Sequence, residues 1–187
     1  MAQNICAIIP ARGGSQRLLR INIYPIWGKP MIVWAIEAAQ KSRLITDVWV
    51  SSEDDEIKKI AFDAGAHVHH RDEALSQDHI FKMEAVREAA QFIEKIKSID
   101  IFISLQANSP QITGDILDKA IEVLVSKGRD ELISVNSDLM MNAAFRIMKS
   151  SYVYQKDLST KMGVFICELK DIHTLEDVHA LENSQGI

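Results

Sequence analysis

Proline and glycine are scarce in this sequence, with four prolines and eight glycines among 187 residues. A chain so poor in both residues is neither collagen-like nor a low-complexity segment. Cysteine is rarer still, since Cys6 and Cys167 are the only two, and both stand in apolar stretches. Two buried thiols are typical of a protein from a reducing compartment, whereas small secreted domains depend on a disulfide framework.

Long apolar runs and an excess of basic residues are also missing. About 20 consecutive apolar residues are needed to span a bilayer, and no segment approaches that length. The apolar run at residues 5–9 is too short for a signal-peptide core, and no basic segment precedes it. The formal net charge is −5, whereas a general binder of nucleic acid or of anionic membranes needs a basic surface. We therefore expect a cytoplasmic protein that binds neither nucleic acid nor a membrane.

The sequence does contain enough apolar residues for a core, 47% of the chain, which suits a single domain over residues 1–187. Short apolar runs predict strands at residues 4–9, 47–51, 66–69, 101–105, 132–135 and 163–167. Amphipathic stretches predict helices after Pro30, after Ser52, at residues 80–96, after Thr113 and after Thr174. Alternation of strands and helices over residues 4–135 predicts the α/β class, with three layers and a mainly parallel sheet covered by helices on both faces.

Finer patterns predict helix ends and faces. Ser52 with Asp55 predicts one helix start, Gly65 predicts its end, and Thr174 with Asp177 forms a capping box. The helix at 80–96 carries an apolar stripe of Phe81, Ala85, Ala89, Phe92 and Ile96. Residues 136–160 are polar, contain methionines and have no clear period, so no regular element is predicted there.

The loop after the first predicted strand reads Arg12-Gly13-Gly14-Ser15-Gln16-Arg17. Ligands of open parallel sheets bind at the carboxyl ends of strands. Adjacent glycines let backbone N–H groups approach an anion, and an arginine can grip two phosphate oxygens. The loop is neither a Walker A motif nor a dinucleotide fingerprint. Its spacing fits a polyphosphate-binding loop, and equally a flexible connector with two surface arginines.

Several segments together resemble the sugar-acid cytidylyltransferases, above all the N-acylneuraminate (CMP-sialic acid) branch. They are residues 8–15 (IIPARGGS), 22–23 (NI), 28–30 (GKP), 48–57 (VWVSSEDDEI), 105–110 (LQANSP) and 171–177 (DIHTLED), with Arg71, Leu75 and Asp78 between them. The related CMP-Kdo synthetases share Pro-Ala-Arg and Gly-Lys-Pro but lack the double glycine. The resemblance implies a fold like that of nucleotide-diphospho-sugar transferases.

The resemblance also implies an activity. Such enzymes transfer CMP from CTP to the anomeric hydroxyl of a 2-keto sugar acid, release pyrophosphate and need Mg²⁺. The acid would be of the sialic, legionaminic or pseudaminic type. Two alternatives stay open at this point: a divergent homologue that binds nucleotide or a partner without turnover, and another nucleotidyltransferase with a different base or sugar.

Roles for individual residues follow from the same resemblance. The triphosphate would be held by Arg12 and Asn22, the two catalytic residues, together with Gly13, Gly14 and Ser15. Arg71 would read the cytosine edge. The sugar-acid side would be lined by Gln106, Asn108 and Ser109, and Asp171 would be the Mg²⁺ ligand. Simpler roles compete with these: a surface charge for Arg12, a turn for Asn22, an ion pair with Asp72 or Glu73 for Arg71, a polar turn for residues 106–110, and a lead-in to the last helix for Asp171.

The chain departs from the family at chemically important positions. Gln16 stands where a lysine is usual, and residues 19–21 (LRI) replace Pro-Gly-Lys, so that Arg20 restores one charge only in part. His173 replaces the second of two aspartates, and imidazole is a poor Mg²⁺ ligand. Residues 79–82 (HIFK) replace small hydroxyl residues.

Residues 136–162 correspond to a dimerisation arm that is longer in the relatives, so a homodimer is expected with a shortened arm.

Two further groups of residues predict structure rather than chemistry. His67 and His69 would share a strand face, but without a third ligand we expect solvated or edge-strand histidines, His70 included, rather than a zinc site. The three tryptophans are expected in the core rather than as stacking platforms: Trp27, Trp34 and Trp49.

Overall fold

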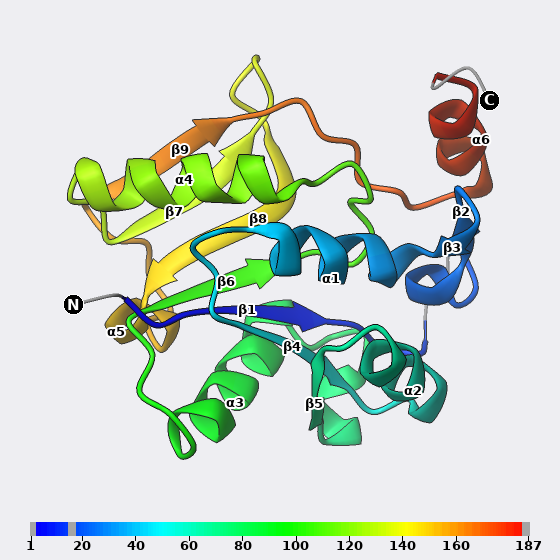
Figure 1. The fold of residues 1–187 in the computed structure, drawn as a ribbon, viewed down its shortest axis with the longest axis horizontal. Helices are drawn as coiled ribbons and strands as arrows, with labels where there is room; N and C mark the ends of the chain where they lie inside the picture. Colours follow the sequence, from blue (N-terminus) through cyan, green and yellow to red (C-terminus); the bar gives the residue numbers. More distant parts are fainter. Residues whose placement is uncertain (1–2, 15–17, 185–187) are drawn as a thin grey trace.

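A computed structural model describes residues 3–14 and 18–184. Its centre is a seven-stranded sheet in the order β5-β4-β1-β6-β8-β7-β9 (Figure 1). The strands are β1 (Ile5–Pro10), β4 (Asp47–Ser52), β5 (His67–His70), β6 (Ile101–Leu105), β7 (Glu131–Val135), β8 (Met141–Lys149) and β9 (Met162–Ile166). All of them run parallel except β8, which is antiparallel to both of its neighbours. The predicted α/β class and mainly parallel sheet are confirmed.

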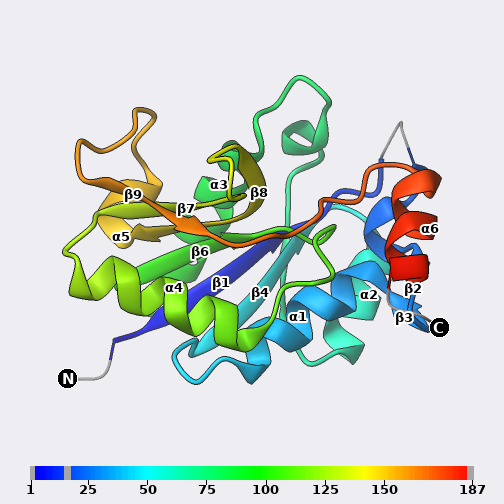
Figure 2. The ribbon, with the colours of Figure 1, turned by 90° about the horizontal axis from the view of Figure 1, so that it is seen from above.

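Helices cover both faces of this sheet, as the sequence predicts. The helices are α1 (Met31–Lys41), α2 (Asp55–Asp63), α3 (Lys82–Glu94), α4 (Gly114–Ser126), α5 (Ser150–Val153) and α6 (Leu175–Ser184), with 3₁₀ turns η1 (Ile21–Ile23) and η2 (Glu73–Ser76). One core cluster joins α1, α2 and α4 to the sheet, and another joins α3 and α5 to its opposite face (Figure 2). The three layers follow directly from these two clusters.

The central strand β1 shows how the sequence produces both cores. Its side chains alternate between the faces, so Ala7 and Ile9 belong to the cluster with α1 and α4. Cys6 and Ile8 belong to the cluster with α3. All four are fully buried, which is why this strand reads as a continuous apolar run rather than as an alternating pattern.

Strand β8 was not predicted, and the expectation of no regular element at residues 136–160 is wrong. The strand pairs with β6 and β7 in the middle of the sheet. Two irregularities hide it in the sequence. Its register against β7 shifts between Ile133 and Val135, and Ala143 has a positive φ of 55°. Its burial therefore does not alternate, and strict alternation is the pattern by which a half-buried strand is recognised.

Helix ends follow local capping chemistry, with one correction. The capping box of α6 is confirmed, because the amide of Thr174 donates to Asp177 and the amide of Asp177 donates to the Thr174 hydroxyl. The start of α2 lies two residues later than predicted. Asp54, not Ser52, is its N-cap and accepts from the amide of Ile57 at 2.9 Å.

The buried face of α3 also differs from the prediction. Ala85 and Ala89 are buried as expected, but Phe81 is 80% exposed, and Phe92 and Ile96 are exposed as well. The inner face is instead completed by residues one position away along the same helix, Val86, Ala90 and Ile93. Small side chains bring α3 close to the sheet beneath it.

A third apolar cluster lies at the end of the molecule where α6 packs beside β2 (Pro25–Ile26) and β3 (Lys29–Pro30), as both views show (Figures 1 and 2). Trp27 and Trp34 pack against it with their rings at 88° to each other. Trp49 packs against the α3 cluster. The three tryptophans are half-buried and pack against these clusters, so the prediction of core positions is met only in part.

The histidines of β5 lie on an edge strand, as predicted. His67 and His70 are exposed, but His69 is buried, with Nδ1 3.1 Å from the Ser51 hydroxyl and Nε2 3.2 Å from Glu88. Burial is the largest cause that lowers the pKa of His69 to about 4. This histidine is therefore neutral and is held within the fold between Ser51 and Glu88.

Two composition-based expectations concern cysteines and membranes. Both thiols are free, and Cys6 is buried as expected while Cys167 is half-buried. Within residues 3–14 and 18–184, no helix has the length and apolar character that crossing a bilayer requires.

Candidate functional site

A cavity of about 370 Å³ opens at the carboxyl ends of β1, β5 and β6. This is the edge at which open parallel sheets bind ligands. Five of the residues singled out from the sequence line it: Arg12, Asn22, Arg71, Gln106 and Asn108. Further polar residues share its wall, among them Asp78, Lys82 and His173.

Arg12 is fixed in this cavity from two sides. Its guanidinium lies 2.6 Å from the Asp78 carboxylate and also contacts the carbonyl oxygen of Ser76. The side-chain amide of Asn22 donates to the Arg12 carbonyl oxygen at 2.9 Å. Asn22, the middle residue of η1, therefore holds the backbone of the loop that carries Arg12.

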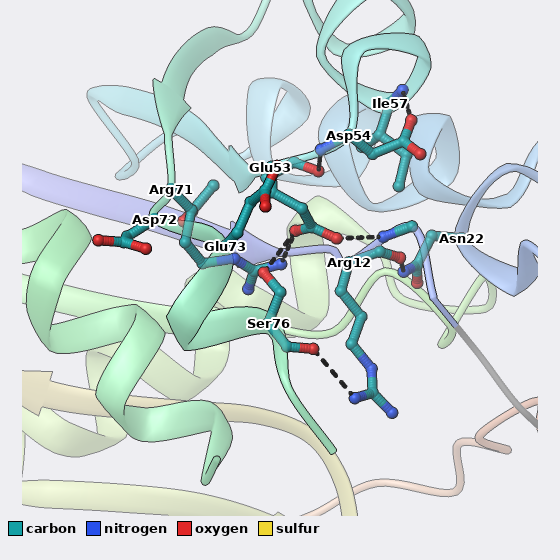
Figure 3. A network of polar contacts seen from close by, with 12 residues as sticks. Arg12, Asn22, Glu53, Asp54, Ile57, Arg71, Asp72, Glu73 and Ser76 are labelled. Carbon is teal, nitrogen blue, oxygen red and sulfur yellow. Dashed lines mark hydrogen bonds and ion pairs between the residues drawn. The ribbon is translucent and has the colours of Figure 1, made fainter. Parts of the chain in front are cut away.

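Glu53 is the centre of the polar network at this edge (Figure 3). One carboxylate oxygen accepts from the amide of Gly13 at 2.7 Å. The other accepts from the Arg71 guanidinium at 2.6 Å and from the Ser76 hydroxyl at 2.7 Å. The side chain of Arg71 is 4% exposed and that of Glu53 is 16% exposed. One carboxylate thus joins three separate segments of the chain.

The protonation state of Glu53 follows from these contacts. Burial alone would raise its pKa, but the hydrogen bonds from Arg71, Ser76 and Gly13 outweigh burial and lower the pKa to about 2. Hydrogen bonds to a carboxylate favour its charged form. Glu53 is therefore an anion at every physiological pH, and Arg71 pairs with it rather than with Asp72 or Glu73.

The glycine loop has a more specific geometry than the sequence suggested. A Cβ on Gly13 would lie 2.4 Å from an Asp54 carboxylate oxygen, whereas a Cβ on Gly14 would meet no atom within 4 Å. The Gly13 amide is directed to Glu53, not to open space. Ser15, like Gln16 and Arg17, lies outside the described residues.

Arg20 does not line the cavity. Its guanidinium pairs with Asp54 at 3.1 Å and with Glu56 at 2.8 Å. The charge that Arg20 was expected to restore near the triphosphate is thus committed to two carboxylates at the start of α2.

The end of β6 supplies the opposite wall. The side-chain nitrogen of Gln106 is buried and has no hydrogen-bond partner among the described residues. Two hydrogen bonds join Asn108 to Ile172. The side-chain amide of Asn108 donates to the backbone carbonyl oxygen of Ile172 at 2.8 Å, and the Ile172 amide donates to the backbone carbonyl oxygen of Asn108 at 2.9 Å. Asn108 therefore fastens the segment before α6 to the cavity, while Gln106 presents a donor that nothing in the described protein satisfies.

Ser109 and Asp171 lie behind this wall and do not line the cavity. Ser109 is fully buried and its hydroxyl donates to the Asp171 carboxylate. Asp171 borders a neighbouring hollow of about 440 Å³, and His173 lines both spaces. Burial raises the pKa of Asp171, against the opposing effects of the Ser109 hydroxyl and the charges of His173 and Lys82.

The carboxylates of the described residues do not form a complete magnesium site by themselves. No cluster of three or more His, Cys, Asp or Glu side chains that suits a metal is found among the described residues. Mg²⁺ is commonly held by one or two carboxylates, with substrate phosphates and water completing its shell. Asp171 is one such carboxylate beside the cavity, and it would hold Mg²⁺ only together with a phosphate ligand.

Sequence reasoning missed Glu53, Ser76 and Lys82 as site residues. Glu53 stands in an acidic run that reads as the first turn of a helix. One signal was present, because Glu53 immediately follows β4 and so lies at the ligand-binding edge of a parallel sheet. Lys82 was noted only as a departure, and its place at the start of α3 puts it in the cavity wall.

Comparison with known proteins gives a consistent result. A family model described as Cytidylyltransferase matches residues 6–184. N-acylneuraminate cytidylyltransferase A of Danio rerio is 37% identical over 134 residues, which are 72% of this chain and 30% of that protein. Pseudaminic acid cytidylyltransferase of Campylobacter jejuni is 34% identical over 158 residues, which are 83% of this chain and 68% of that protein.

The fold has solved counterparts as well. A CMP:2-keto-3-deoxy-manno-octonic acid synthetase, solved in complex with CTP, has a TM-score of 0.77 at 17% identity and covers 97% of this chain and 99% of that one. A cytidylyltransferase from Leptospira borgpetersenii has a TM-score of 0.76 at 19% identity, with 99% of this chain and 88% of that one covered. At these identities the likeness shows the fold alone.

Proposed function

Because this chain belongs to the cytidylyltransferase family, we propose that it transfers CMP from CTP to the anomeric hydroxyl of a 2-keto sugar acid and releases pyrophosphate. The observation that carries the proposal is the cavity at the carboxyl edge of the sheet. It combines two anchored arginines with a buried amide donor that has no partner among the described residues. The sugar acid would be of the sialic, legionaminic or pseudaminic type.

Each wall of the cavity then has a role. Arg12, held by Asn22, would bind the triphosphate, and Arg71, held by Glu53, would read the cytosine edge. Gln106 and Asn108 would face the sugar acid. A reaction of this kind demands little covalent work from the protein, so positioning and neutralisation of charge carry the catalysis.

Magnesium belongs to the same proposal. Asp171, held by Ser109, would provide a carboxylate ligand next to the cavity. The ion would neutralise charge on the triphosphate when bound, and the phosphates themselves would complete its shell. His173 stands beside this carboxylate and adds no hard oxygen ligand.

The direct test is pyrophosphate release from CTP and Mg²⁺ with a panel of 2-keto sugar acids. Release that depends on both CTP and one acid supports the proposal. Release with another nucleotide but not with CTP would reject the cytidine assignment. Binding of CTP without release from any acid would reject the enzyme and favour a homologue that binds nucleotide without turnover.

Exchanging His173 for aspartate is expected to strengthen the magnesium site. The change places a second carboxylate two residues from Asp171, and carboxylate oxygen is the ligand that Mg²⁺ prefers. The Mg²⁺ concentration that gives half-maximal activity should fall about tenfold. His179→Asp is the control, since His179 is an exposed residue of α6. An unchanged Mg²⁺ requirement in His173→Asp would contradict the role of Asp171.

We also propose that the protein is a cytoplasmic homodimer. The supporting feature is β9, the strand at the end of the sheet, where Val164 is 45% exposed and Ile166 is 56% exposed. Apolar side chains on an edge strand invite pairing with another chain. Sedimentation equilibrium should show a dimer that Ile166→Lys weakens, and a monomer at micromolar concentration would contradict the proposal.

A further inference from the structure

The cations of the cavity differ in what they are bound to. Arg12 is paired with Asp78, and Arg71 is paired with Glu53. Lys82 lines the same cavity, yet no described residue forms a hydrogen bond or a short ion pair with it. Asp171 acts on Lys82 electrostatically, without such a bond. Lys82 is thus the cation of the described wall that no carboxylate holds.

The surroundings of Lys82 are suited to an anion. Lys82 is the first residue of α3, a helix of 13 residues whose N-terminus is capped by no side chain. The N-terminal end of a helix carries partial positive charge that adds to the field of a lysine. The unsatisfied side-chain nitrogen of Gln106 lines the same cavity.

Lys82 stays exposed to solvent at this wall, so a ligand that enters the cavity can reach it. A bound oxyanion would pair with the Lys82 ammonium group and would also satisfy the Gln106 donor.

We propose that Lys82, with Gln106, binds an oxyanion of the substrates in this cavity and fixes its position for the transfer. The oxyanion is either a phosphate of CTP or the carboxylate of the sugar acid. This inference rests on the proposed function for the identity of the ligands. Lys82 adds a binding residue that the resemblance to the family did not assign.

Isothermal titration calorimetry of the full chain tests the inference by measuring binding, so that no catalytic turnover is needed. The probes are CTP and N-acetylneuraminate, with cytidine and the methyl ester of the acid as uncharged counterparts. Lys82→Gln should weaken one anionic probe roughly 10- to 100-fold, the range for a hydrogen bond to a charged group. Weaker CTP binding assigns the phosphate, and weaker acid binding assigns the carboxylate. Both uncharged counterparts should bind as before.

Two variants separate binding from folding. Lys82→Arg keeps the charge and should retain most of the affinity. If Lys82 had only a structural role, Lys82→Gln would bind the anionic probes as well as Lys82→Arg does. Lys95→Gln removes the same charge from the opposite end of α3 and should change neither affinity. The inference is overturned if Lys82→Gln binds both anions like the wild type, or if the wild type binds neither. Binding without pyrophosphate release would reject the proposed function and leave the result for Lys82 intact.

Discussion

Replacing Glu53 with glutamine is expected to lower kcat/KM for CTP about 100-fold and the free energy of unfolding by about 3–5 kcal/mol. The three groups around this side chain, from Gly13, Arg71 and Ser76, all donate to it. Glutamine offers one acceptor oxygen and an NH₂ group that would face another donor. Breaking a buried ion pair by removing one partner strands the other charge, and this sets the expected loss of stability.

The loss of activity has a separate cause. Without the carboxylate, the loop after β1 loses its contact at Gly13 and the Arg71 guanidinium loses its partner. A misplacement of about 1 Å at a binding group can cost about 100-fold in rate. Glu53→Asp keeps the charge one methylene shorter and should recover part of both properties. Glu56→Gln removes an acid from an exposed pair with Arg20 and serves as the control.

Acid titration gives an independent readout of the same contact. The pKa of Glu53 is lowered from 4.5 to about 2 in the folded protein. Its contribution to stability is therefore complete above about pH 4.5 and is lost as the pH falls toward 2. Chemical unfolding between these pH values should show this loss in the wild type and a smaller loss in Glu53→Gln. Equal pH dependence in the two proteins would contradict the role of Glu53.

The sequence predicted the position of the site better than its internal contacts. Strand ends can be read from short apolar runs, and the carboxyl ends of parallel strands meet at one edge. This logic places the loop of Arg12 at that edge, whereas Gln106 and Asn108 were expected there from the resemblance to the family; all three line one cavity. The partners of a side chain are another matter. Glu53 reaches Gly13 across 40 positions and Ser76 across 23, and no local pattern encodes either contact.

The missed strand shows the same limit within the fold. β8 lies inside the sheet, yet its residues include Asn142 and Ala143 and lack a regular period. Pairing with β6 and β7 makes this segment a strand, so tertiary context overrides a weak local preference. The face of α3 was misread for a related reason. Ala85 and Ala89 fit either of two adjacent faces of the helix. The large residues Phe81 and Phe92 favoured the face that the structure shows to be exposed.

Replacing Arg12 with alanine should separate catalysis from stability, in contrast to the change at Glu53. We expect kcat/KM to fall about 100- to 1000-fold, the effect of removing a single donor to a developing charge. The ion pair of Arg12 with Asp78 joins side chains that are 37% and 56% exposed, and such pairs contribute about 0–1 kcal/mol. The free energy of unfolding should therefore stay nearly constant.

Arg20→Ala is the matched control for this prediction. It removes the same charge from the same stretch of chain, but Arg20 pairs with Asp54 and Glu56 and does not line the cavity. Arg12→Lys should fall between the wild type and Arg12→Ala, because lysine keeps the charge but cannot grip two phosphate oxygens at once. Initial rates of pyrophosphate release and urea unfolding measure the two properties separately. If Arg20→Ala reduced kcat/KM as much as Arg12→Ala, general attraction of the triphosphate by positive charge would explain the effect, and the specific role of Arg12 in the cavity would be refuted.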